Sequence, residues 1–298
     1  MAPAPGGGCW WAFRAKLRRL DAAAQVNFLY PYRVLTLANV DSTRQLLTWA
    51  AHDRPLAVHY VSTTDVLPAT AASRPTAPEP AELVTGYAQT KWVSERLVAQ
   101  AADRGLPATI YRPGEISGAS ATGAWNTNSL LCALIRVIAD TGSAPDVDVP
   151  LNLVPVDHVT ETITRLLTLP PVGATYRVAD PRPAAFPLLV ERDAAQVCPL
   201  RTEPYPRWVE RVTDLTAGQP HHPFSPHVPL LSAPAAEGPA LLSILRPRPR
   251  PRPPTAAELD PASVLAPDAP SCPPVDSDLV DLYLGYLRRI GFIPTPRG

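Results

Sequence analysis

The sequence predicts an α/β protein in which a parallel sheet is followed by a smaller C-terminal lobe. Three observations support this fold class. Short β-branched apolar runs alternate with longer stretches of helical spacing between residues 33 and 178. Hydrophobic residues make up 46% of the 298 residues, which is enough for a sizeable core. Beyond Pro183 the alternation stops and prolines become frequent, which indicates a change of architecture.

The first helices and strands follow from periodicity. Residues 40–51 have helical spacing, and residues 55–62 form a compact β-branched run that ends in hydroxyl side chains. A long helical pattern covers residues 82–102, and glycine and proline then stop it. A buried strand is expected at residues 108–112.

The alternation continues through the middle of the chain. A third helix is expected at residues 128–140, a strand at 151–154, a fourth helix at 157–167 and a closing strand at 175–178. Parallel strands need crossover connections, which are usually helices. This order therefore predicts a parallel sheet with helices on its faces.

The C-terminal region, residues 184–298, is expected to form an irregular and helical lobe. Residues 246–254 carry alternating arginine and proline, which favours an extended polyproline II rod. We interpret this tract as a stiff linker, because no flanking aromatic or further basic cluster supports a peptide ligand or an anionic-surface patch. Residues 275–290 form an amphipathic helix that needs a surface to pack on.

The charge balance and the apolar stretches exclude two classes of partner. The chain has 27 basic and 27 acidic side chains, so it is not a globally cationic nucleic-acid binder. The longest apolar stretch, residues 129–139, is too short to span a bilayer and carries Arg136. We therefore expect neither a nucleic-acid nor a membrane partner.

The cysteines and histidines show no pattern typical of a metal site. The cysteines are too widely spaced for a metal knuckle or a dense disulfide framework, and a reducing cytoplasm fits them best. The clustered histidines lack a neighbouring cysteine and the ligand spacing of zinc. These residues are Cys9, Cys132, Cys198, Cys272, His221, His222 and His227.

One pair of side chains suggests acid–base chemistry. Tyr87 and Lys91 are four residues apart, so they lie on one face of the helix predicted at residues 82–102. A nearby cation favours the phenolate and brings the proton affinity of a tyrosine, whose reference pKa is ~10, into a useful range. Thr63 follows the strand at 55–62, and open α/β sheets bind ligands at the carboxyl ends of their strands. Its hydroxyl can hydrogen-bond a substrate carbonyl.

A Tyr-x-x-x-Lys pair alone also arises by chance on a helix surface. The surrounding segments of sequence therefore decide whether the pair indicates an active site. Five segments resemble the extended short-chain dehydrogenases/reductases, and within them the thioester reductase domains that end nonribosomal peptide synthetases and carboxylic acid reductases. The string at residues 26–32, Val-Asn-Phe-Leu-Tyr-Pro-Tyr, is more specific than the Tyr/Lys pair. The five segments are residues 26–32, 38–43, 61–63, 86–92 and 153–159.

The resemblance implies a role for each matching residue. Tyr87 would deliver a proton to the carbonyl oxygen. Lys91 would hold the nicotinamide ribose and tune the phenol, and Thr63 would orient the carbonyl. The residues that would line the nicotinamide side are Pro113, Gly114 and Ile116.

The same resemblance implies a cofactor, a substrate and a partner. The cofactor would be NADPH, and the substrate an acyl or peptidyl thioester on the phosphopantetheine arm of a carrier protein. The product would be an aldehyde, or an alcohol after a second reduction. The region after Pro183 would bind the acyl chain and the carrier. An NAD-dependent sugar-nucleotide epimerase or dehydratase is the alternative enzyme, and the string at residues 26–32 argues against it.

The sequence departs from the family at its start. The family opens with a strand and a Gly-x-x-Gly-x-x-Gly turn that holds the cofactor pyrophosphate, and this turn is absent. We interpret residues 1–21, which include the glycine run at 6–8, as an N-terminal tail. Residues 22–183 then form a partial Rossmann-like, doubly wound domain without its first βαβ half, which would be roughly 80–100 residues.

A sheet of this kind would expose the edge of its central strand, which predicts pairing with another chain. Three explanations stay open. The chain is a fragment of a full reductase, which we favour because Thr63, Tyr87 and Lys91 are all present. Alternatively a separate polypeptide completes it, or it is a catalytically silent scaffold that keeps carrier contacts.

Overall fold

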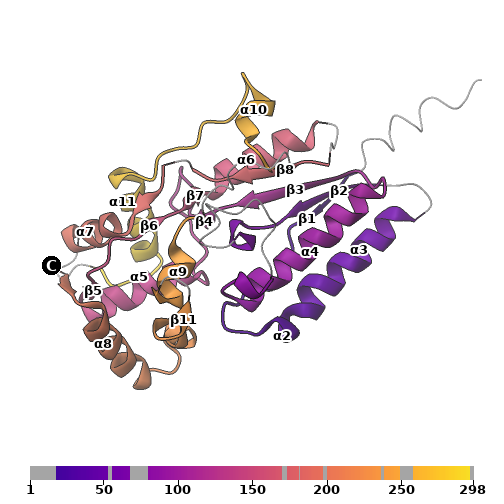
Figure 1. The fold of residues 1–298 in the computed structure, drawn as a ribbon. Coiled ribbons are helices and arrows are strands. Elements are labelled where there is room, and N and C mark those ends of the chain that lie inside the picture. Colours follow the sequence, from indigo (N-terminus) through magenta and orange to yellow (C-terminus); the bar gives the residue numbers. More distant parts are fainter. Residues whose placement is uncertain are drawn as a thin grey trace, which may run out of the picture.

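The main element of the fold is a five-stranded sheet in which every neighbouring pair of strands is parallel. The computed structural model describes residues 18–52, 56–67, 80–169, 173–180, 182–196, 200–235, 238–248 and 258–295. The expected α/β class with a parallel sheet is confirmed, and Figure 1 shows helices packed along the sheet. The strands, in spatial order, are β1 (Arg18–Asp21), β2 (Ala57–Val61), β3 (Ala108–Pro113), β8 (Thr175–Val178) and β13 (Glu258–Leu259).

Two long helices pack side by side on one face of the sheet (Figure 1). The first is continuous, with a π-helical turn in its middle. Its apolar side chains and those of the second helix, among them Leu47 and Val98, enclose Ile110 of β3 in a shared core. The elements are α2 (Tyr32–Thr36), η1 (Leu37–Asp41) and α3 (Ser42–Ala51) in the first helix, and α4 (Gly86–Asp103) as the second.

Helix α6 (Val156–Leu167) covers the opposite face. Successive strand residues point to opposite faces, so Tyr111 faces away from α3 and α4. It packs with Val159 of α6 and with Tyr176 of β8. The short helix α10 (Pro261–Leu265) lies beside α6.

The strand expected at residues 151–154 is not part of the main sheet. Asn152 divides it into two short strands, and the Asn152 carbonyl accepts a hydrogen bond from the Glu115 N–H at 2.9 Å. An apolar run predicts that a strand forms, but it does not predict which strand it pairs with. The prediction that residues 151–154 join the main parallel sheet was therefore wrong. The pairs are β6 (Pro150–Leu151) with β9 (Ala184–Ala185), antiparallel, and β7 (Leu153–Pro155) with β4 (Glu115–Ser117), parallel.

A second, largely helical lobe has its own core. The amphipathic helix expected at residues 275–290 is confirmed as α11, and it buries Leu284 and Leu287. Trp208 is fully buried and donates its indole N–H to the Ser143 carbonyl at 3.0 Å. The elements are α5 (Leu130–Thr141), β5 (Ser143–Pro145), α7 (Phe186–Gln196), β10 (Arg201–Glu203), α8 (Tyr205–Ala217), η5 (Ser225–Leu231), β11 (Pro234–Ala235), β12 (Gly238–Pro239), α9 (Ala240–Leu245) and α11 (Ser277–Arg289).

Two expectations differ from the structure or fall partly outside it. Residues 18–21, expected in the N-terminal tail, form β1 because they pair with β2; the run Arg-Arg-Leu-Asp carries no strand periodicity of its own. The glycine run at 6–8 and residues 249–254 of the Arg/Pro tract lie outside the described residues. Where the tract begins, Arg248 is buried, with 5% of its surface exposed.

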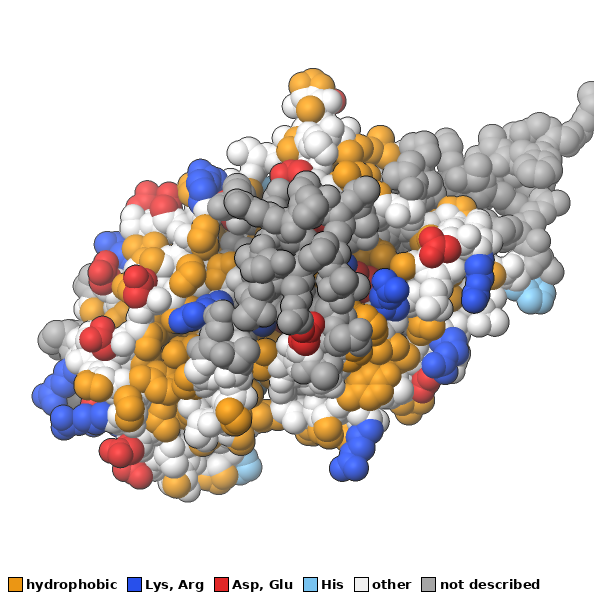
Figure 2. All heavy atoms as spheres, in the orientation of Figure 1, with side chains coloured by type: hydrophobic (Ala, Val, Ile, Leu, Met, Phe, Trp, Pro, Cys, Tyr) orange, Lys and Arg blue, Asp and Glu red, His pale blue; other side chains and the backbone are white. Residues whose placement is uncertain are grey.

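The surface carries charges of both signs. Figure 2 shows acidic and basic side chains interspersed over the face that it draws, in line with the formal net charge of zero. None of the helices in the described ranges is long and apolar enough to cross a bilayer.

Candidate active site

The start of α4 is held tightly against the segment that follows β1. The hydroxyl of Thr85 caps the helix by accepting a backbone N–H from its first turn at 3.1 Å. A Cβ on Gly86 would stand 2.4 Å from the Tyr30 carbonyl oxygen. Only a glycine permits this approach, and it fixes the position of the next residue, Tyr87.

Tyr87 is buried against the string at residues 26–32. Phe28 meets its ring edge-on, with the ring centroids 5.8 Å apart and the planes at 84°. Asn27 shapes the string, because its Oδ1 accepts the backbone N–H groups two and three residues further on, at 2.9 and 2.8 Å. The string therefore presents an aromatic wall to the phenol.

Asn39, in the π-helical turn η1, connects the same region to α4. Its Oδ1 accepts the Gln25 N–H at 2.7 Å, and its Nδ2 donates to the Thr90 hydroxyl at 3.0 Å. The Ser94 hydroxyl donates to the Asn39 carbonyl at 2.7 Å. Single π-turns occur frequently at functional sites, and this one anchors the helix that carries Tyr87.

Lys91 lies one turn after Tyr87 and points at the end of β2. Its ammonium donates to the Val61 carbonyl at 2.7 Å and stands 4.1 Å from the centre of the Tyr60 ring, a cation–π contact. The side chain is almost completely buried, and this burial lowers the pKa of Lys91 to about 8.

Thr63 lies two residues beyond the carbonyl that Lys91 contacts. It is the N-cap of the short helix η2 (Thr64–Val66), and its hydroxyl accepts the Asp65 N–H at 3.2 Å. Because η2 packs against α4, the structure brings Thr63, Tyr87 and Lys91 to the carboxyl end of β2. This is the edge where open α/β sheets bind their ligands.

Burial and titratable groups on three other elements disfavour the ionised form of Tyr87. Burial is the largest cause that raises the pKa of Tyr87, followed by Asp65 of η2, Tyr60 of β2 and Glu115 of β4. This differs from the sequence-based argument, in which Lys91 favours the phenolate. The physical reason is that Lys91 is turned toward the Val61 carbonyl and the Tyr60 ring. The phenol therefore keeps its proton at neutral pH.

Glu115 is the second unusual acid of the site. Burial, with a smaller contribution from Asp65, raises the pKa of Glu115 to about 7. Its backbone is fixed by the contact with Asn152, and it directly follows Gly114. A carboxyl group that titrates near neutrality therefore lies in electrostatic range of the phenol.

Hydrogen bonds and ion pairs connect the strand ends to one another. The Ser62 hydroxyl donates to Glu95 at 2.7 Å, and Arg112 contacts both Glu95 and, at 3.0 Å, Glu258. At the far end of this network, Arg248 stands 3.7 Å from Asp65. In order, the contacts join Ser62, Glu95, Arg112, Glu258, Arg177, Arg248 and Asp65.

The three residues expected beside the nicotinamide lie around the turn after β3. Pro113 and Gly114 are buried, and a Cβ on Gly114 would stand 2.6 Å from the Asn152 amide nitrogen. Ile116 of β4 is 37% exposed. The turn thus places two residues inside and one at the surface.

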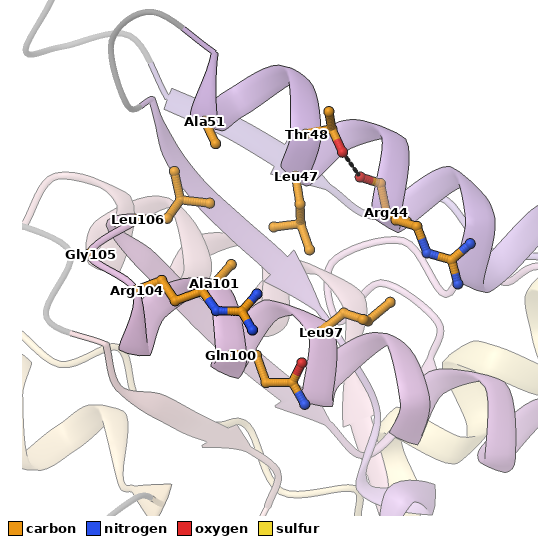
Figure 3. Close-up of a pocket in the computed structure, with 10 residues that line it drawn as sticks. All are labelled: Arg44, Leu47, Thr48, Ala51, Leu97, Gln100, Ala101, Arg104, Gly105 and Leu106. Atoms are coloured by element: carbon orange, nitrogen blue, oxygen red, sulfur yellow. Dashed lines mark hydrogen bonds between the residues drawn. The ribbon is translucent and has the colours of Figure 1, made fainter.

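A groove of about 380 Å³ between α3 and α4 lies apart from these residues. Leu47, Leu97 and Leu106 line it, and Figure 3 shows Arg44 and Arg104 beside them. The groove lies at the carboxyl end of the 18-residue helix α4, whereas Tyr87 is at its start. At 1.5 Å rise per residue, the α4 residues that line the groove lie roughly 15–20 Å from Tyr87 along the helix, so the groove is not part of the site.

Comparison with known proteins shows the family of this chain. A solved structure, the terminal R domain from the myxalamid PKS-NRPS biosynthetic pathway, matches with a TM-score of 0.79 at 35% identity, over 93% of this chain and 69% of that one. The chain belongs to the family of terminal reductase (R) domains. These are the reductase domains of nonribosomal peptide and polyketide synthetases, within the extended short-chain dehydrogenases/reductases.

Further similarities agree with this family. The NAD-binding family described as "Male sterility protein" matches residues 20–163 of the reductase domain. Glycine betaine reductase ATRR of Emericella nidulans is 40% identical over 187 residues, which are 58% of this chain and 14% of that protein. A thiolation-reductase di-domain from an archaeal non-ribosomal peptide synthetase has the same fold, with a TM-score of 0.71 at 15% identity, over 92% of this chain and 58% of that one. The chain thus spans a small part of the curated relative's length.

The described residues of the reductase domain fit an NAD(P) cofactor at its nicotinamide end. The Lys91 ammonium has three N–H donors, and within the described ranges it hydrogen-bonds only the Val61 carbonyl. It can therefore donate to ribose hydroxyls. At the pyrophosphate end, the printed sequence has no Gly-x-x-Gly-x-x-Gly turn.

Sequence reasoning missed three residues of the site. In the sequence, Asp65 follows Thr63 by two positions and Glu115 directly follows Gly114. An acidic residue so close to a candidate site residue was a signal that could have identified both. Arg248 lies in the Arg/Pro tract, where neighbouring arginines hide any individual role. That the clustered histidines do not bind a metal stays a prediction. One of them, His222, has its Nε2 3.1 Å from a carboxylate oxygen of Asp140.

Proposed function

We propose that this reductase domain releases an acyl or peptidyl thioester from a phosphopantetheinyl carrier protein as an aldehyde, with NADPH as the reductant. The observation that carries the proposal is the meeting of Thr63, Tyr87 and Lys91 at the carboxyl end of β2. The thiolation-reductase di-domain of the same fold supports a carrier as partner. The NAD-binding family match supports a nicotinamide cofactor.

Each side chain has one task in this proposal. The Thr63 hydroxyl donates to the substrate carbonyl oxygen and orients the thioester. Tyr87, which its raised pKa keeps protonated, donates its proton to that oxygen. Lys91 holds the nicotinamide ribose. The residues that line the nicotinamide side in this proposal are Pro113, Gly114 and Ile116.

The electron and proton balance is that of a thioester reduction. When bound, the cofactor supplies hydride to the carbonyl carbon. The carbon–sulfur bond of the resulting hemithioacetal then breaks and the thiol leaves. One thioester, one NADPH and one proton give one aldehyde, one thiol and one NADP⁺. A second round would give the alcohol.

The region after residue 183 binds the acyl chain and the carrier in this proposal. It supplies most of the second lobe, whose core surrounds α11 and α5. The beginning of this lobe's Arg/Pro tract reaches the site through the Arg248 contact with Asp65. A lobe that touches the reacting end of the sheet is well placed to position an acyl group.

We also propose that the outer edge of β1 pairs with a strand from another polypeptide or from another part of a longer chain. Among the described strands, β1 pairs with β2 alone. Large apolar side chains lie exposed near this edge and along the adjoining helix: Leu20 is 51%, Val26 58% and Leu37 75% exposed. Such a strand would complete the sheet and cover these side chains.

The test is a fluorescence titration of the purified chain with NADPH, followed by aldehyde trapping from an acylated carrier protein. We expect saturable micromolar binding that weakens in Lys91→Ala, and an aldehyde in the wild-type reaction. Absence of both would leave the second candidate, a catalytically silent module that contacts the carrier.

A further inference from the structure

Arg248 connects the second lobe to the loop that carries Thr63. It follows α9, and only 4% of its side chain is exposed. One guanidinium nitrogen, Nη1, donates to the Ser243 carbonyl at 2.7 Å, and the other, Nη2, lies 3.7 Å from Asp65 Oδ1. The backbone N–H of Asp65 in turn donates to the Thr63 hydroxyl at 3.2 Å. Two contacts thus separate the guanidinium from the proposed carbonyl-orienting hydroxyl.

We propose that Arg248 is a positioning residue of the reductase site: through Asp65 it holds the Thr63 loop in place and balances the negative charge that faces Tyr87. The inference rests on the proposed function. It assigns a catalytic supporting role to a residue of a tract whose composition alone favours a linker.

The burial of Arg248 supports this role. A guanidinium excluded from water needs compensating partners, and its Nε is buried without a hydrogen-bond acceptor among the described residues. Among the described residues, Asp65 and the Ser243 carbonyl therefore compensate the guanidinium for its loss of hydration. The backbone is held as well, because Arg177 donates to the Arg248 carbonyl. Arg248 is therefore held in the folded structure and is not an exposed part of a linker.

The charges around the phenol show why Asp65 needs a counter-ion. Asp65, Tyr60 and Glu115 face Tyr87 from η2, β2 and β4, and all three disfavour its ionised form. Lys91, on the same helix, is engaged by the end of β2. Arg248 favours the ionised form of Asp65, opposing the effect of burial on that carboxyl. Without the guanidinium, the buried Asp65 carboxyl would lose its described counter-ion, and any charge it kept would oppose the negative charge that develops on the carbonyl oxygen during reduction.

The test compares Arg248→Gln, Arg248→Lys and the double variant Asp65→Asn/Arg248→Gln. Arg288→Gln is the matched control, because Arg288 makes a buried ion pair with Asp193 inside the second lobe. We expect kcat for thioester reduction to fall about tenfold or more in Arg248→Gln, with NADPH affinity unchanged. Arg248→Lys should recover part of the rate. The double variant should be faster than Arg248→Gln, because the unpaired carboxylate is gone.

Hydrogen–deuterium exchange of the peptide covering residues 61–67 provides a readout that does not need turnover. It should increase in Arg248→Gln and not in Arg288→Gln. An unchanged kcat and unchanged exchange in Arg248→Gln, or equal effects in the Arg288→Gln control, would overturn the proposal. If the wild type itself makes no aldehyde, the proposed function fails, and exchange alone decides whether Arg248 holds the loop.

Discussion

Tyr87 illustrates how burial selects a chemical role for a side chain. Burial, and to a smaller extent the charges of Asp65 and Glu115, raise the pKa of Tyr87, so the phenol keeps its proton and suits the donor that a carbonyl reduction needs. The helix that carries Tyr87 is predicted correctly, whereas the role of Tyr87 as proton donor stays a prediction. The sequence does not predict the direction of the Tyr87 pKa shift, because that direction depends first on burial and then on acids from η2 and β4, which only the folded chain brings together.

Lys91 gives a prediction for pH. Burial lowers its pKa to about 8, from an ordinary value of 10.5, so the ammonium that would hold the cofactor is lost as pH rises through that value. We expect NADPH affinity to weaken above pH 8 in a titration series from pH 6 to pH 10. Affinity that stays constant across this range would show that the charge on Lys91 is not used.

The same shift predicts an effect on stability. Between pH 8 and 10.5 the unfolded chain binds more protons than the native chain, so the contribution of Lys91 to stability rises with pH there. Below pH 8 the buried ammonium of Lys91 lowers the free energy of unfolding. Lys91→Met should therefore unfold at an equal or higher urea concentration than the wild type at pH 7, while its NADPH affinity is lost. A large loss of stability would contradict this.

At the scale of the element, the start of α4 depends on Gly86. Replacing it with alanine would drive a methyl group into the Tyr30 backbone, so either the helix or the string at residues 26–32 must move. We expect Gly86→Ala to destabilise the fold and to lower the reduction rate together, because Tyr87 shifts with the helix. Urea unfolding and aldehyde formation measure the two effects.

Gly285 in α11 is the matched control for this prediction. Nothing lies within 4 Å of a Cβ added there. Gly285→Ala should therefore stabilise the protein by roughly 0.5–1 kcal/mol, the usual gain for alanine over glycine in a helix interior. Equal destabilisation by both variants would show that close packing at Gly86 is not the cause.

The elements themselves were largely predictable, and their partners were not. Hydrophobic periodicity located α4, α11 and β8 closely, because each has a clear apolar face or run. It could not tell that residues 151–154 pair outside the main sheet, because pairing is decided by the turn after β3 and by Asn152. It also missed β1, whose pairing with β2 outweighs its polar sequence.

At the scale of the whole molecule, Glu258 of β13 ties the last strand to its neighbours. Its carboxylate is 3.0 Å from Arg112 and 3.8 Å from Arg177, and 7% of its side chain is exposed. Removing one partner of a buried ion pair leaves uncompensated charge. Glu258→Gln should therefore cost about 3 kcal/mol of the free energy of unfolding.

The exposed pair of Glu161 and Arg165 is the control for this measurement. Glu161→Gln should change the free energy of unfolding by less than about 1 kcal/mol, as is usual for surface pairs. Similar costs for both variants in urea unfolding would mean that the network at the strand ends does not stabilise the fold.

The central claim is that Tyr87 protonates the carbonyl oxygen during reduction, and Tyr87→Phe tests it most directly. The measurement is the initial rate of aldehyde formation from an acylated carrier with NADPH, beside an NADPH binding titration. The account predicts a rate about 100-fold or more below the wild type with cofactor affinity unchanged. Equal rates for wild type and variant would contradict it.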